Sequence, residues 1–175
     1  MAHLPAFDCR AMSAALDERR RDEGLSWFEL ADVLWDQSAR LNARLQDSCL
    51  CGGALGRLPQ RDDTSCQYAM FALRWLDRAP EEFLAGPTAD VGDTSLPRAD
   101  SASRLRWDLP ALHAALDADR VTRGLTWKAL ADEIGCTPNR LTNLKAARLA
   151  DMDLVMRVTQ WLARPAAAFI HPTDW

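Results

Sequence analysis

The chain has 175 residues, of which 48% are hydrophobic, so we expect a globular protein of one or two domains rather than a disordered one. No apolar run approaches the roughly 20 residues of a membrane-spanning helix, and the start of the chain lacks a secretory signal pattern. The net charge is −4, with 11 basic and 17 acidic residues before position 101 and 10 basic and 8 acidic residues after it. We therefore expect a cytoplasmic protein without a membrane partner, whose second part is better suited to meet an anion.

Two parts of the sequence match each other at a constant shift of 100 positions. A repeat of this length indicates a duplicated domain rather than a solenoid unit. The matches include AALD at 14–17 and 114–117, GLSW at 24–27 with GLTW at 124–127, LAD at 30–32 and 130–132, and RL at 40–41 and 140–141.

The first copy reads as a series of helices. Asp8 can cap a helix that runs to about Glu23, and Gly24 can end it. Ser26 and Glu29 have the spacing of a capping box, which opens a second helix to about Leu34.

The second copy repeats these helices, with Asp108 and Thr126 as the caps. Gly135 then breaks the chain, because glycine adopts a positive φ at no steric cost. Thr137 is a good cap and Pro138 suits the first position of a third helix, which we expect to end near Lys145.

A fourth helix is expected after Asp151, because apolar residues follow at helical spacing, and a short fifth helix ends near Ile170. The first copy ends in the same way, because residues 75–84 match residues 161–170, but the shift between these segments is 86 instead of 100. We therefore predict an insertion of 14 residues in the first copy, at about 47–64. The domains are then 1–84 and 104–175, and the Pro- and Gly-containing segment 85–103 is a flexible linker.

Two short helices joined by a glycine-containing turn form a helix-turn-helix. Residues 125–145 (LTWKALADEIGCTPNRLTNLK) resemble the lambda-repressor/Cro-like, or XRE-type, DNA-binding family. The shared features are a small residue in the second helix, the turn glycine, the cap and two apolar residues three positions apart. The resemblance covers about 108–170 and extends more weakly to 8–84. It implies an all-α protein of two tandem five-helix domains.

In that family the third helix enters the major groove and reads base edges. Carried over to this chain, the resemblance implies that the base-reading positions are Thr137, Asn139, Thr142 and Asn143, with Arg140 beside them. Asparagine pairs with adenine, and arginine with guanine or phosphate. Lys145 and Arg148 are placed to contact phosphates, which supply much of the affinity.

The sequence departs from the family pattern in three respects. Trp27 and Trp127 stand where the family usually has a polar residue. They would either cover the junction of the helices within each copy or form a contact between the two copies. We expect the contact between the copies, which would hold them together as a compact pair. The first copy has no turn glycine, so its second and third helices would be distorted or continuous. The overall charge is acidic, which leaves Arg40 and Arg44 as the evident anion ligands of the first copy.

The five cysteines carry a weaker signal. An odd number in a chain without an export signal favours reduced thiols. Cys49, Cys51 and Cys66 could supply three zinc ligands, but no fourth ligand is near in sequence, so we expect no metal and no cofactor. No nucleophile–base pair or phosphate-binding glycine loop is evident, and we expect no enzymatic activity.

The sequence therefore predicts a non-catalytic, sequence-specific regulator of transcription that binds double-stranded DNA mainly through its second domain. The alternative is a protein-interaction or self-associating module that kept the fold and lost DNA binding.

Overall fold

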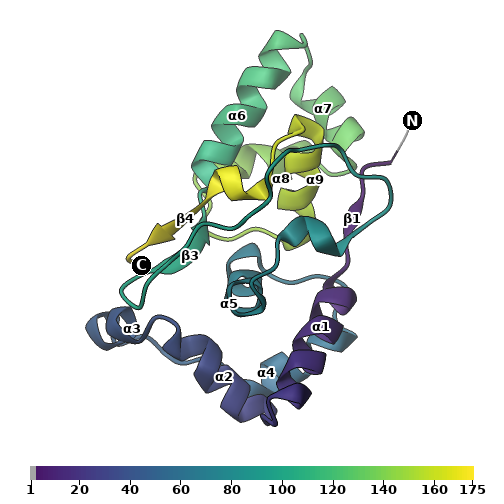
Figure 1. Cartoon of the computed structure of the whole chain (residues 1–175). Helices are drawn as coiled ribbons and strands as arrows, with labels where there is room; N and C mark the ends of the chain where they lie inside the picture. Colours follow the sequence, from purple (N-terminus) through teal and green to yellow (C-terminus); the bar gives the residue numbers. More distant parts are fainter. Residues whose placement is uncertain (1–2) are drawn as a thin grey trace.

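A computed structural model describes residues 3–175, and the architecture of this part is predominantly helical (Figure 1). The first half contains β1 (Ala6–Phe7), α1 (Cys9–Asp22), α2 (Trp27–Asp36), α3 (Ala39–Leu45), α4 (Gly52–Gly56), the 3-10 turn η1 (Leu58–Gln60), α5 (Cys66–Leu76), η2 (Pro80–Phe83) and β2 (Leu84–Ala85). The second half contains β3 (Arg104–Trp107), α6 (Leu109–Thr122), α7 (Trp127–Ile134), α8 (Pro138–Thr142), η3 (Asn143–Lys145), α9 (Met152–Leu162), η4 (Ala166–Phe169) and β4 (Ile170–Thr173).

Four helix starts follow the capping signals in the sequence, whereas Thr137, predicted to cap α8, makes no side-chain capping hydrogen bond. Asp8 accepts a hydrogen bond from the backbone N–H of Ala11 at 2.9 Å, and Asp108 accepts one from Ala111 at 3.0 Å. The capping box predicted for Ser26 is formed in full, and Thr126 caps α7 without a glutamate. The predicted helical character and these helix starts are therefore confirmed.

Short strands, which were not predicted from the sequence, close each half. β1 pairs with β2, and β3 pairs with β4, in two antiparallel two-stranded sheets. Each pair joins the segment before the first helix of a half to the segment after its last helix. The strands have only two to four residues, too few for a period-two pattern to be recognised.

The extra residues of the first half lie earlier than the predicted 47–64. That segment forms α4 and η1, which pack against α2 and α1 as α8 and η3 pack against α7 and α6. The shift of 86 already applies here, because it aligns α4 with α8 and places buried Leu55 and Leu58 on buried Leu141 and Leu144. The contacts thus place the additional residues at about 36–49, and these include α3.

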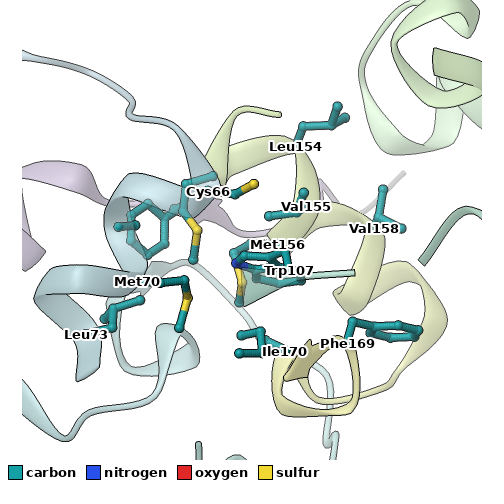
Figure 2. Packing of buried hydrophobic residues seen from close by; sticks show 14 of the residues in the cluster. Cys66, Met70, Leu73, Trp107, Leu154, Val155, Met156, Val158, Phe169 and Ile170 are labelled. Atoms are coloured by element: carbon teal, nitrogen blue, oxygen red, sulfur yellow. The ribbon is translucent and has the colours of Figure 1, made fainter. Parts of the chain in front are cut away.

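The two halves share one continuous hydrophobic core. Figure 2 shows Cys66, Met70 and Leu73 of α5 facing the cluster that Trp107 forms with side chains of α9 such as Met156. The expectation of a compact pair is therefore confirmed, and residues 104–175 alone would expose the face of α9 that α5 covers.

Hydrogen bonds between the halves occur in reciprocal pairs. The N–H of Cys66 donates to the carbonyl of Ala150 and the N–H of Met152 donates to that of Thr64, both at 2.8 Å. The shift of 86 exchanges these two bonds, so an approximate twofold axis passes through the bridge that joins Ser65 and Asp151.

Two side chains extend this symmetry. The backbone N–H of Trp107 donates to Gln67 Oε1, and the N–H of Phe7 donates to Asp153 Oδ1, each at 2.9 Å. Trp107 and Phe7 are equivalent under the shift of 100, and Asp153 and Gln67 under that of 86. Each half thus holds the strand of the other through the second residue of its α5 or α9 helix.

Within the predicted flexible linker 85–103, residues 86–103 have no helix or strand, but they are tied to both halves. Arg74 donates hydrogen bonds to the carbonyls of Ala99 and Asp100, and Gln160 Oε1 accepts one from the N–H of Ala89. The segment therefore follows a defined path along the surface. Within residues 3–175, no helix is both long and apolar enough to span a membrane.

Candidate nucleic-acid interface

The segment that carries the predicted base-reading residues is anchored by two leucines. Gly135 ends α7 with a φ of 82°, a value that favours glycine and that lets the chain turn sharply into α8. Leu141 in α8 and Leu144 in η3 are both buried against the core. Because these two side chains point inward, the polar side chains around them are left on the outside. The resulting α8 surface consists of Thr137, Asn139, Arg140, Thr142, Asn143, Lys145 and Arg148.

Most of the α8 surface is open to solvent. All of its members are exposed except Thr142, which is half-buried and donates a hydrogen bond from Oγ1 to the carbonyl of Asn139 at 3.3 Å. The structure thus brings the predicted residues of the second copy together on one contiguous stretch of α8, η3 and the residues that follow.

The charge of the α8 surface is opposite to that of the whole chain. Residues 134–150 contain three basic side chains and no aspartate or glutamate. Arg140 forms an ion pair with Asp151, the first acidic residue after this run. Lys145 and Arg148 pair with no carboxylate of the described chain, and the Arg148 guanidinium lies 5.2 Å from the centre of the Trp175 ring. Two cations are therefore available to an anionic partner.

Arg40 and Arg44 do not occupy the equivalent place in the first half. They lie on α3, the additional helix, which contacts the end of the linker segment through the bond from Leu41 N–H to Ser101 O at 3.0 Å. Arg44 also donates to the carbonyl of Asp174 at 2.7 Å. The structure does not group these arginines with the α8 surface, because α3 has no counterpart in the second half.

The equivalent of the α8 surface in the first half is formed by α4 and η1, which the shift of 100 does not reveal. Its exposed basic residues are Arg57 and Arg61, which with Ala54 and Gln60 line a surface hollow of about 260 Å³. The shift of 86, applied to the leucine pair, would have revealed this correspondence in the sequence.

The repeated tryptophans have a role within each half and not between the halves. The guanidinium of Arg20 lies 4.5 Å from the ring centre of Trp27, and that of Arg120 lies 4.7 Å from Trp127. A side chain at Gly56 would meet the Trp27 ring at 3.4 Å. Trp27 thus covers the junction of α1, α2 and α4, and the expected contact between the copies is wrong for these residues.

No group of three or more potential metal ligands comes together within residues 3–175. Cys66 is buried at the start of α5, whereas Cys49 and Cys51 are exposed before α4. Burial raises the pKa of the Cys66 thiol to about 11 and also raises the pKa of Cys9. At neutral pH these two thiols are therefore protonated and poorly nucleophilic.

Alkylation of the native protein should separate four of the five cysteines into two classes. We expect Cys49 and Cys51 to react quickly, because both side chains are open to the reagent, while Cys9 and Cys66 react only after unfolding. Mass spectrometry after a short treatment with iodoacetamide measures this. Native mass spectrometry should show no bound metal, and one stoichiometric zinc ion lost on Cys49→Ser would contradict that expectation.

No family model, curated protein or solved structure matches the chain.

Proposed function

We propose that the chain is a non-catalytic regulator of transcription that binds double-stranded DNA through the α8 surface, on two lambda-repressor-like halves. The observation that carries the proposal is the segment 134–150, which has three exposed basic side chains and no acidic one in a chain of net charge −4. Buried Leu141 and Leu144 anchor α8 and η3 to the core, so the amide and cationic side chains of these segments face outward.

The chemistry of the α8 surface fits recognition of DNA in two parts. Asn139 and Asn143 present amides, which bind adenine edges in the major groove, and Arg140 presents a guanidinium suited to guanine. Lys145 and Arg148 follow the helix and supply the positive charge that phosphates need. The Arg140–Asp151 pair is exposed, so exchange of the carboxylate for a base or phosphate costs little.

The second candidate is a protein-interaction module. The acidic first half favours it, because a surface with an excess of aspartate and glutamate repels the DNA backbone. Failure of the intact chain to bind DNA at low salt would favour this protein-interaction function.

A titration of the intact chain with random-sequence duplex DNA at increasing salt tests the proposal. Each neutralised phosphate contributes about 0.9 to the slope of log affinity against log salt concentration. With few free cations at the interface, we expect a shallow slope of about −2 to −4. Fluorescence anisotropy of a labelled duplex measures the affinity, and the absence of binding at the lowest salt would reject the proposal.

A further inference from the structure

The approximate twofold axis relates the α8 surface to a second basic surface on the first half. The axis passes through the Ser65–Asp151 bridge, and the segments that lead into this bridge are η1 with residues 61–64 and η3 with residues 146–150. A twofold rotation leaves the height along its axis unchanged. The α4–η1 segment and the α8–η3 segment therefore lie at the same end of the molecule, on opposite sides of the axis.

The two segments also share an unusual charge. Residues 48–61, like 134–150, contain no aspartate or glutamate, and they include Arg57 and Arg61. Both arginines are exposed, and no carboxylate of the described chain pairs with either. The acidic residues that follow are already engaged. Asp62 pairs with Arg10, and Asp63 accepts hydrogen bonds from the N–H groups of Thr64 and Asp153.

The side chains that could read bases differ between the two segments. At the positions of Pro138, Asn139 and Arg140, the α4 helix has Gly52, Gly53 and Ala54. A side chain at Gly52 would meet the backbone of Phe28 at 2.8 Å, so close packing of α4 on α2 requires glycine there. The α4 helix thus has no amide or guanidinium on its first turn. Arg57 follows the helix at the position equivalent to Asn143, where it presents a guanidinium suited to phosphate in place of an amide.

From this asymmetry we infer that one chain binds one DNA site as an internal pseudodimer whose halves have different tasks. The α8 surface reads the bases of one half-site. Arg57 and Arg61 hold the phosphates of the neighbouring half-site without discriminating between bases. The inference rests on the proposed function. It adds a second DNA-contacting surface at Arg57 and Arg61, and a DNA site in which one half-site alone carries the recognised sequence.

The test compares the intact chain with Arg57→Ala/Arg61→Ala on a set of duplexes. We expect affinity at low salt to fall by about tenfold or more on every sequence, and the salt slope to become shallower by about 1.8, because two phosphate contacts are lost. The ranking of sequences should not change. Arg57→Lys/Arg61→Lys keeps the charges and should restore the slope, which separates loss of charge from misfolding.

Arg40→Ala/Arg44→Ala removes the same charge from α3 and is the matched control, with affinity expected to stay within about twofold. A selection from random duplexes should return a motif with one informative half, bound by one chain. An Arg57/Arg61 variant that binds like the unchanged protein, a palindromic motif, or two chains per site would overturn the inference while leaving DNA binding intact. Failure of the intact chain to bind any duplex would overturn the proposed function itself.

Discussion

Replacing Arg140 and Asn143 together by alanine should remove most of the sequence preference of DNA binding. Both side chains are exposed on the α8 surface, and neither supports the core, so the fold should persist. Each good base contact contributes about 1–3 kcal/mol of discrimination, or a factor of roughly 5 to 150. Binding to the selected sequence should fall toward the affinity for random DNA. Competition between selected and random duplexes measures this ratio.

The partner of Arg140 provides a control for that experiment. Asp151→Asn removes the carboxylate of the ion pair while keeping the size of the side chain, and Asp151 makes no side-chain capping bond to α9. Affinity should rise, because a negative charge beside the phosphates is lost and Arg140 is released. An unchanged preference in the double variant, with unchanged affinity in Asp151→Asn, would place the DNA contact elsewhere.

Replacing Gln67 by leucine should lower the free energy of unfolding by about 3–6 kcal/mol, a large part of the stability of a typical domain. Its side chain is 2% exposed and makes three hydrogen bonds to the second half. Gln67 Oε1 accepts from the N–H of Trp107 at 2.9 Å, and Nε2 donates to the carbonyl of Trp107 at 3.1 Å and to that of Arg148 at 3.0 Å. Leucine fills the space but leaves these backbone groups without partners, and each unsatisfied buried group costs about 1–3 kcal/mol.

Urea unfolding followed by far-ultraviolet circular dichroism and by tryptophan fluorescence measures this effect. Because the halves share one core, both probes should report a single transition, before and after the substitution. Gln60→Leu changes an exposed glutamine and should alter stability by less than about 0.5 kcal/mol. Two separate transitions, or a Gln67 variant as stable as the control, would contradict the account of the interface.

Local signals predicted the helices well, because they depend on neighbouring residues. The caps at Asp8, Ser26, Asp108 and Thr126 and the turn at Gly135 form as their sequence patterns indicate. The duplication was also visible. The prediction for the first copy was wrong in its alignment between positions 36 and 64, because Arg40-Leu41 matches Arg140-Leu141 by letter although α3 and α8 pack in different places.

The contacts between the halves could not be derived from the sequence. Nothing local distinguishes Gln67 or Asp153 from an ordinary polar residue near a helix start, and their role depends on a backbone strand of the other half. The predicted contact between the copies through Trp27 and Trp127 was wrong for a related reason. A large aromatic at the same position in both copies suggested an interface, whereas each stacks beside an arginine of its own half. The repeat in the sequence indicates that the copies are related, but the position of the twofold axis between them depends on tertiary packing.

The most direct test of the central claim is to follow the backbone amide signals of the intact chain by nuclear magnetic resonance as duplex DNA is added. We expect the largest changes at residues 137–148 and smaller changes around Arg57 and Arg61. The signals of α3 and of the acidic residues Glu29, Asp32 and Asp36 on α2 should stay unaffected. No change on addition of DNA at low salt, or changes centred on α3, would contradict the central claim.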